Sequence, residues 1–239
     1  MHGAHNRGQH IHHGLFRSPD ETKEAAQENL IRLLLETSAL PRGVRVLDVG
    51  CGLGGTSRFL AREHDCEVTG ITISGRQAEM ARKFTLEETG ITTAPSSDLM
   101  SYPNAGHDGA HGGVRFLELD AEKMLEHFSS AGRGPDGPET FDCVWISEAL
   151  SHLPDKPLFF SSSFALLAGS QSSRLVIADW FRAPGLTPEQ VNADVKPIED
   201  GMLLPKLHTT DEYVQMAEQA GFRTVKAPLD ISSDVSKTW

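Results

Sequence analysis

The fold of this 239-residue chain is best predicted from one segment, Val44-Arg45-Val46-Leu47-Asp48-Val49-Gly50-Cys51-Gly52-Leu53-Gly54-Gly55. Its apolar first half predicts a buried strand, and a helix is predicted to follow over 56–64. Gly50, Gly52 and Gly55 fit the G-x-G-x-x-G spacing of loops that bind adenosyl ligands. Such glycines let the backbone approach a ligand at the carboxyl edge of a parallel sheet. A tight turn without a ligand is the alternative interpretation.

Strands and helices alternate along the rest of the chain. A helix is predicted to begin at Ser18, and Ser74 with Gln77 predicts a capping box for another. Such alternation is typical of an α/β, Rossmann-like, doubly wound and mostly parallel sheet with right-handed crossovers. Besides the first strand and helix, we expect strands at 67–73, 114–119, 141–146, 174–180 and 222–227, and helices at 18–40, 74–90, 156–167 and 209–221.

The sequence predicts one domain with an N-terminal arm, a surface insertion and a lid. Residues 1–17 form a polar, histidine-rich arm, and a single domain is predicted over 18–239. Residues 91–113, rich in Pro, Ser, Asn, Gly and His, predict a surface insertion. Residues 181–207 lack a clear period and contain four prolines, which favours a lid over a site.

The composition excludes several classes of protein. With a formal net charge of −11, the surface repels phosphate backbones, so we expect no nucleic-acid substrate. No apolar run reaches the ~18 residues of a membrane span, and the polar N-terminus lacks the pattern of a signal peptide. Cys51, Cys66 and Cys143 are too few and too scattered for a disulfide framework or a metal site. We therefore expect a cytoplasmic protein.

Residues near the glycine loop discriminate between ligands. Asp48, two residues before the first glycine, would repel a pyrophosphate and favour the ammonium of a methionine moiety. An NAD enzyme would place an acid at the end of the second strand to bind the ribose, whereas this chain has Thr72. Arg76 nearby leaves an NADP-dependent reductase open as a less favoured alternative.

Four motifs together resemble a known family. LDVGCGLGG at 47–55 resembles motif I of class I S-adenosylmethionine-dependent methyltransferases. GITIS at 70–74, followed by Gln77, is similar to the second-strand motif of tocopherol, sterol and cyclopropane-fatty-acid methyltransferases. HIHHGLF at 10–16 and WISEALSHLPDK at 145–156 resemble segments of the tocopherol branch, which has natural-product relatives. The resemblance covers nearly the whole chain and is interrupted at 91–113.

The resemblance implies S-adenosyl-L-methionine as cofactor. Asp48 and the loop glycines would surround its methionine and ribose parts, while Thr72 and Gln77 would hold the ribose. Asp120, at the end of the third strand, would bind the adenine amino group; a helix N-cap is its alternative role. The cofactor-binding residues so predicted are Asp48, Gly50, Cys51, Gly52, Gly54, Thr72, Ile73, Gln77, Asp120, Ala121 and Ser147.

Three residues are candidates for catalysis. His152, after the fourth strand, is the best candidate for a general base, because histidine titrates near neutral pH; capping the next helix is its alternative role. Glu148 would bind a cationic substrate or, as we favour, orient the loop. His12 and His13 would contact cofactor or substrate from the arm; alternatively, Leu15 and Phe16 pack on the core and leave the histidines at the rim. His2 and His5 fit a solvated tail. Histidines on an irregular arm do not predict a metal site.

The predicted function is methyl transfer to a small, apolar natural-product or lipid-like acceptor, at oxygen, nitrogen or carbon. The main alternative is a protein of this fold that keeps the cofactor pocket and catalyses a pericyclic cyclisation or an isomerisation. The acceptor itself is not specified by the sequence. An apolar acceptor is suggested by the lid residues Trp180, Phe181, Leu186, Met202, Leu203 and Leu204, although such residues more often pack than bind.

The resemblance also implies a seventh, antiparallel strand, whereas the sequence pattern predicts six. Without it, the strand at 174–180 would expose unpaired backbone groups along one edge. Of three explanations we favour truncation of a longer product, with pairing across a homodimer as the second choice. The third is a shift of the strand at 222–227 to pair with this edge.

Overall fold

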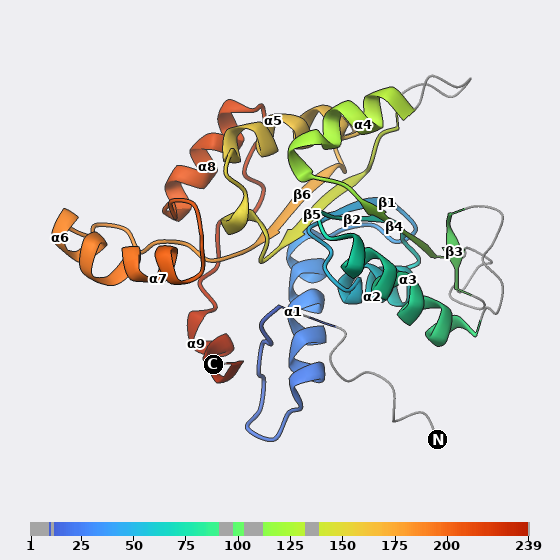
Figure 1. Cartoon of the computed structure of the whole chain (residues 1–239), viewed down its shortest axis with the longest axis horizontal. Helices are drawn as coiled ribbons and strands as arrows, with labels where there is room; N and C mark the ends of the chain where they lie inside the picture. Colours follow the sequence, from blue (N-terminus) through green and yellow to red (C-terminus); the bar gives the residue numbers. More distant parts are fainter. Residues whose placement is uncertain (1–9, 11, 91–97, 103–111, 132–138, 239) are drawn as a thin grey trace.

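The computed structural model describes residues 10, 12–90, 98–102, 112–131 and 139–238. At its centre lies a six-stranded sheet in the order β3-β4-β2-β1-β5-β6, in which every pairing except β3 with β4 is parallel (Figure 1). The strands are β1 Arg45–Val49, β2 Glu67–Thr72, β3 Met100–Ser101, β4 Gly113–Glu118, β5 Cys143–Ser147 and β6 Arg174–Ala178. The predicted α/β class with a mostly parallel sheet is confirmed.

Helices cover both faces of the sheet. On one face α1 Lys23–Ser38, α2 Gly55–His64 and α3 Gly75–Thr89 form a core with Val46 and Trp145. On the other, α4 Met124–Ala131, α5 Lys156–Leu166 and α8 Thr210–Gln219 pack on Leu47 and Val49 (Figure 1). Successive residues of a strand point to opposite faces, so β1, which is buried on both, is apolar at Val46, Leu47 and Val49.

The remaining elements are short. They are η1 Ala121–Lys123, η2 Leu150–His152, α6 Pro188–Gln190, the π-helical turn η3 Val191–Val195, α7 Lys196–Gly201, α9 Ser232–Val235 and η4 Ser236–Thr238. None of the helices in the described ranges is both long and apolar enough to cross a membrane.

The first helix begins later than the sequence predicts. Its N-cap is Thr22, whose hydroxyl accepts a hydrogen bond from the Ala25 amide, so the start predicted at Ser18 is wrong. Glu21 is engaged elsewhere: its carboxylate accepts from the Arg17 amide at 2.7 Å and from the Asn29 side chain at 2.8 Å. The Glu21 carboxylate therefore closes the loop in front of the helix.

The two edges of the sheet also differ from expectation. The strand predicted at 222–227 does not form, and within the described residues no strand follows β6. Phe222 instead packs edge-to-face on Phe164 of α5, at 5.2 Å between ring centroids. The sixth strand is β3, inside the predicted insertion 91–113, and it pairs antiparallel to β4. Residues 91–97 and 103–111 of that insertion lie outside the described residues.

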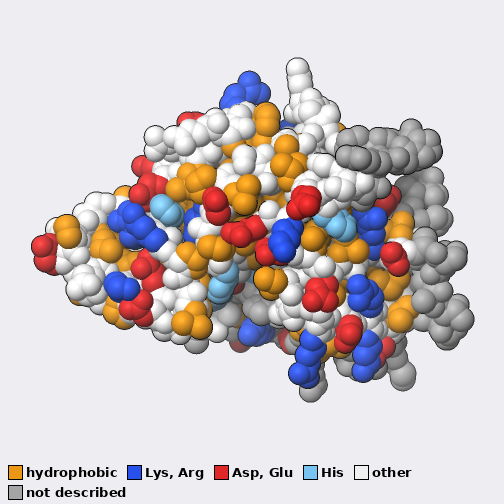
Figure 2. Space-filling view, turned by 45° about the horizontal axis from the view of Figure 1, so that its top comes forward, with side chains coloured by type: hydrophobic (Ala, Val, Ile, Leu, Met, Phe, Trp, Pro, Cys, Tyr) orange, Lys and Arg blue, Asp and Glu red, His pale blue; other side chains and the backbone are white. Residues whose placement is uncertain are grey.

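The predicted lid, 181–207, contains the short helices α6, η3 and α7 and projects from the domain at the left of Figure 1. Val195, Leu204 and Leu207 pack together in a small core of their own, against which Trp180 lies. Ile198, Met202 and Leu203 remain exposed. The same projection lies at the left of Figure 2, where hydrophobic side chains stand among charged ones.

Candidate functional site

A cavity of about 690 Å³ opens at the carboxyl edge of the parallel strands. Such a volume lies within the range of small-molecule sites, and this edge is where ligands of open α/β sheets bind. Nearly all the predicted site residues line it: Asp48, Gly50, Cys51, Gly52, Thr72, Ile73, Gln77, Asp120, Ala121 and Ser147 from the cofactor set, and His13, Glu148 and His152 from the catalytic set. Gly54 is the exception, since it is absent from the cavity wall.

Asp48 lies at the bottom of the cavity, near the end of β1. Its side chain is buried, and its Oδ2 accepts a hydrogen bond of 2.6 Å from the Ser57 hydroxyl of α2. Burial raises the pKa of this carboxyl to about 6, and the Ser57 bond opposes part of that rise. A cation bound beside this carboxylate would stabilise its ionised form.

The glycine loop is tied to the neighbouring strands. The amides of Gly50 and Cys51 both donate to the carbonyl of Ile71, at 2.9 and 3.0 Å. Gly50 has φ +74°, and a Cβ atom there would lie 2.4 Å from the Cβ of Ala149. A side chain at position 50 would therefore be strained in its backbone and would collide with the loop that follows β5.

This close approach predicts a stability difference between two glycine variants. Gly50→Ala should lower the free energy of unfolding by about 2–4 kcal/mol, from the left-handed backbone plus overpacking. Gly43→Ala is the matched control, because Gly43 has φ +71° and open space around its Cβ position. It should lose only about 1–2 kcal/mol. Urea unfolding of both variants measures the difference. Equal decreases in the free energy of unfolding would show that the contact with Ala149 does not contribute to the effect.

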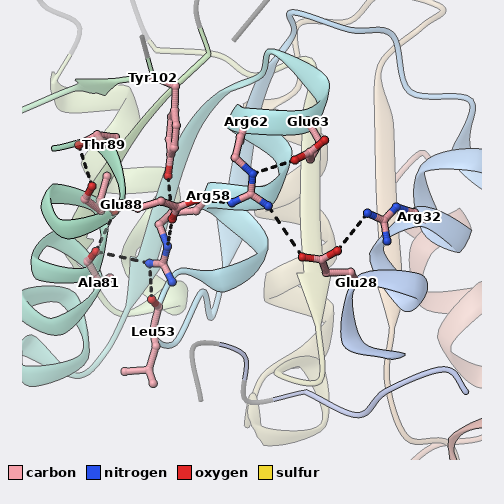
Figure 3. A network of polar contacts seen from close by, with 11 residues as sticks. Glu28, Arg32, Leu53, Arg58, Arg62, Glu63, Ala81, Glu88, Thr89 and Tyr102 are labelled. Atoms are coloured by element: carbon pink, nitrogen blue, oxygen red, sulfur yellow. Dashed lines mark hydrogen bonds and ion pairs between the residues drawn. The ribbon is translucent and has the colours of Figure 1, made fainter. Parts of the chain in front are cut away.

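Beneath the loop, a buried arginine binds one of its carbonyl groups. Arg58 of α2 is 1% exposed, and its Nη1 donates to the Leu53 carbonyl at 2.7 Å (Figure 3). Its Nε lies 3.2 Å from the carboxylate of Glu88, which also binds Arg62 and Tyr102. Burial lowers the pKa of Arg58, and the Glu88 carboxylate opposes this. The network binds the glycine loop through the Leu53 carbonyl.

At the end of β2, Thr72 and Gln77 form a polar pair. The Thr72 hydroxyl donates to Oε1 of Gln77 at 2.8 Å and accepts from the Ser74 amide at 3.3 Å. Ser74 caps α3 as predicted, but the side chain of Gln77 turns to Thr72, so only half of the predicted capping box is present. Ile73 is 74% exposed beside them and offers an apolar surface to a flat ligand.

Asp120 caps the turn after β4. Its Oδ1 accepts from the Glu122 amide at 3.0 Å, so the helix-cap role is confirmed. Asp120 and Ala121 also line the cavity, and the adenine contact proposed for Asp120 stays a prediction.

The N-terminal arm forms a wall of the cavity, and its first residues, His2 and His5 among them, lie outside the described part. The backbone amide of His13 and its Nδ1 both bond the Glu148 carboxylate, at 2.9 and 2.7 Å. Gln27 of α1 donates to the His12 carbonyl at 2.6 Å. Burial lowers the pKa of His10 to about 3 and also lowers that of His12, so both rings are neutral near pH 7.

Glu148 contacts the N-terminal arm, and its predicted role of orienting the loop after β5 stays a prediction. It lies at the end of β5 with φ +53°, its amide donates to the Ala178 carbonyl, and its carboxylate binds the arm. A strained backbone held by contacts on both sides is typical of functional sites. The interaction joins the arm to the edge of the sheet.

His152, at the end of η2, is exposed on the cavity wall, and within the described residues its ring makes no hydrogen bond. The next helix is capped by Asp155, whose carboxylate accepts from the Leu158 amide at 2.8 Å. The alternative role of His152 as a cap is therefore wrong.

Sequence reasoning missed part of the cavity wall. Glu122, Ala149, Ser151, Leu153 and Pro154 also line it, each of them within two residues of a predicted site residue. Among the described residues, no group of three or more His, Cys, Asp or Glu side chains could hold a metal ion. Burial raises the pKa of the Cys51 thiol far above its ordinary value, so this residue is protonated and is no nucleophile.

Comparisons with known proteins find methyltransferases among the relatives of this chain and a solved structure of the same fold. The sequence profile of the mycolic acid cyclopropane synthetase family matches residues 12–130. The chain is 29% identical to a probable chloroplastic tocopherol O-methyltransferase of Oryza sativa subsp. japonica, over 97% of this chain and 59% of that protein. It is 30% identical to the O-methyltransferase cnsE of Penicillium expansum, over 91% of this chain and 67% of that protein. The solved structure of the [4+2]-cyclase SpnF has the same fold, with a TM-score of 0.68 and 23% identity over 95% of this chain and 69% of that one.

Proposed function

The chain belongs to the mycolic acid cyclopropane synthetase family of class I S-adenosylmethionine-dependent methyltransferases, and from that premise we propose that it methylates a small, apolar acceptor. The chain spans less than two thirds of the length of the rice relative. The observation that carries the proposal is the buried Asp48 carboxylate beneath a glycine loop, in a cavity that also contains Thr72, Gln77 and His152.

The cofactor follows from the chemistry of the cavity wall. S-adenosylmethionine carries an ammonium and a sulfonium, which suit the carboxylates of Asp48, Asp120, Glu122 and Glu148 better than a pyrophosphate does. The Thr72–Gln77 pair offers hydrogen bonds to the ribose hydroxyls, and Ile73 a surface for the adenine. Arg76, which an NADP enzyme would use, is exposed and absent from the described cavity wall, and this disfavours the reductase.

Part of the cavity wall is apolar, and His152 is the favoured base in the cavity. Leu153, Pro154, Trp180 and Met202 line it, and no lysine or arginine occurs among the described lining residues. Transfer of a methyl group from a sulfonium to an oxygen or nitrogen forms one bond and breaks one, and the acceptor must lose a proton. His152 accepts that proton, while the apolar wall and the arm orient the acceptor and exclude water.

Cofactor binding should depend on pH through Asp48. Only the ionised carboxylate attracts the ammonium, and the pKa of about 6 means that protonation competes with binding in mildly acidic buffer. We expect the dissociation constant to be constant above about pH 7 and to rise about tenfold per pH unit below 6. Calorimetry between pH 5 and 8 measures this. In Asp48→Asn the profile should be flat, and an equally steep profile in that variant would assign the dependence to another group.

The reaction is tested with methyl-labelled S-adenosylmethionine and a panel of phenols, amines and unsaturated lipids. Formation of S-adenosylhomocysteine together with an equal amount of labelled product supports methyl transfer. Conversion of an acceptor to an isomer of the same mass, with the cofactor intact, would favour the cyclase or isomerase alternative instead; SpnF is a cyclase of the same fold. Turnover that requires NADPH would support the reductase.

The proposal also covers the localisation, the substrate class and the oligomeric state of the protein. We infer a cytoplasmic enzyme of secondary metabolism that does not act on nucleic acid, in line with the net charge of −11. A homodimer that covers the outer edge of β6 is proposed, because within the described residues that edge has no partner strand. Light scattering that gives a monomeric mass would refute the dimer.

A further inference from the structure

A buried lysine lies directly behind the loop that carries His152. Lys156, the first residue of α5, is 2% exposed. Its Nζ donates to the carbonyl of Leu153 at 3.0 Å and to that of Ser151 at 3.4 Å. These two carbonyls belong to the residues immediately before and after His152.

A carboxylate holds the same loop from the end of β6. Oδ2 of Asp179 accepts from the Ser151 amide at 3.1 Å, and its Oδ1 accepts from the Trp180 amide at 2.7 Å. Ser151 is therefore bound at its amide by Asp179 and at its carbonyl by Lys156. The side chain of Trp180, the next residue after Asp179, lines the cavity.

The buried position of Lys156 is not explained by a contribution to the stability of helix α5 or of the core. An ammonium in the first turn of a helix is repelled by the positive end of the helix dipole, and burial of a charge costs free energy unless it is hydrogen-bonded. The helix already has an N-cap in Asp155. Both hydrogen bonds of the Lys156 ammonium go to backbone carbonyls of the loop that carries His152. We therefore infer that Lys156 stabilises the conformation of that loop.

We propose that Lys156 and Asp179 are positioning residues that fix the backbone on both sides of His152 and so hold its imidazole against the acceptor. The inference rests on the proposed function, in which His152 takes the acceptor's proton. Neither residue is among those that line the cavity, so both act through His152.

The main test is a double-mutant cycle of Lys156→Met and His152→Ala, with activity, cofactor affinity and thermal midpoint measured for each variant. Lys156→Met should lower kcat about 10- to 100-fold with little change in cofactor affinity or in the acceptor KM, because a small misplacement of a catalytic group has such an effect. In the His152→Ala background the same change should cost less than about threefold, since there is no imidazole left to misplace. Full additivity of the two losses would overturn the inference.

Controls separate positioning from a general loss of structure. Lys196→Met removes a lysine from another first turn, where it is exposed and binds Asp200, and it should leave kcat unchanged. If Lys156→Met fails to fold, Asp179→Asn takes its place in the cycle, because it keeps the size of the side chain and weakens its bond to the Ser151 amide. The same non-additivity with His152→Ala is expected.

A second readout does not depend on turnover. In protein with isotope-labelled histidines, the ring signals of His152 should shift or broaden in Lys156→Met and Asp179→Asn, while those of the exposed His127 stay in place. An unchanged His152 spectrum in both variants would overturn the inference even if methyl transfer is confirmed. Conversely, full activity of His152→Ala would refute His152 as the base, whereas the spectra would still report whether Lys156 and Asp179 hold the loop.

Discussion

Asp48→Asn should weaken the binding of S-adenosylmethionine by about 100-fold or more. The buried carboxylate loses its charge but keeps its shape, so the cofactor's ammonium is left without its ionic partner. Charge-assisted hydrogen bonds contribute about 1.5–3 kcal/mol, and a buried ion pair loses more when one partner is removed. A factor of 100 corresponds to about 2.8 kcal/mol. Calorimetric titration of variant and wild type measures the ratio.

The same substitution should not damage the fold. Burial raises the pKa of Asp48 from 3.8 to about 6, so the folded protein binds this proton more tightly than the unfolded chain does. Stability therefore falls as the pH rises from about 4 to 6, and the full cost of the buried charge is present above pH 6. Asp48→Asn removes that cost, and its thermal midpoint at pH 7.5 should equal or exceed that of the wild type.

Asp142→Asn is the matched control. Asp142 immediately precedes β5, at the opposite end of the sheet, where it accepts a hydrogen bond from the Arg45 amide. Its replacement should leave cofactor affinity within about twofold, because the charge is distant from the cavity and screened by salt. Wild-type affinity in Asp48→Asn, or an equal loss in both variants, would remove Asp48 from the cofactor site.

His152→Ala should lower kcat by about 10²- to 10⁴-fold and leave cofactor affinity unchanged. The reason is the loss of general-base assistance, which contributes about this much when a positioned side chain accepts the proton. The imidazole is exposed on the cavity wall, and helix α5 is capped by Asp155, so its removal should not lower the thermal midpoint. Single-turnover measurements with saturating cofactor separate the chemical step from product release.

The control for this variant is His127→Ala. His127 is exposed on α4, where its ring packs against Phe128, and it is absent from the cavity wall. It should retain wild-type turnover. If His152→Ala also retains wild-type turnover, the His13–Glu148 pair becomes the next candidate for the proton acceptor. The proposed role of Lys156 in positioning a catalytic His152 would then be refuted as well.

Features that depend on the local pattern of apolar residues and glycines could be predicted from the sequence. An apolar run before closely spaced glycines predicted β1 and the loop, and the end of each parallel strand then placed Asp48, Thr72, Asp120 and Glu148 around one cavity. This works because the side-chain period and the direction of a parallel strand together decide which residues reach the ligand edge.

Features that depend on tertiary contacts were not predicted. Gln77 could satisfy either the helix amide or Thr72, and only the fold shows that Thr72 is the partner. The segment 222–227 has the apolar pattern of a strand, but Phe222 packs on Phe164 of α5 instead. Lys156 reads as an ordinary polar residue at a helix start, and its burial behind His152 arises from residues that are close in space.

The central claim is that the cavity beneath the glycine loop is a site for S-adenosylmethionine. The most direct measurement is calorimetric titration of the wild-type chain at pH 7.5 with S-adenosylmethionine, S-adenosylhomocysteine and NADPH in turn. We expect one equivalent of either adenosyl compound per chain, competition between the two, and no heat with NADPH. Binding of NADPH with no binding of S-adenosylmethionine would contradict it.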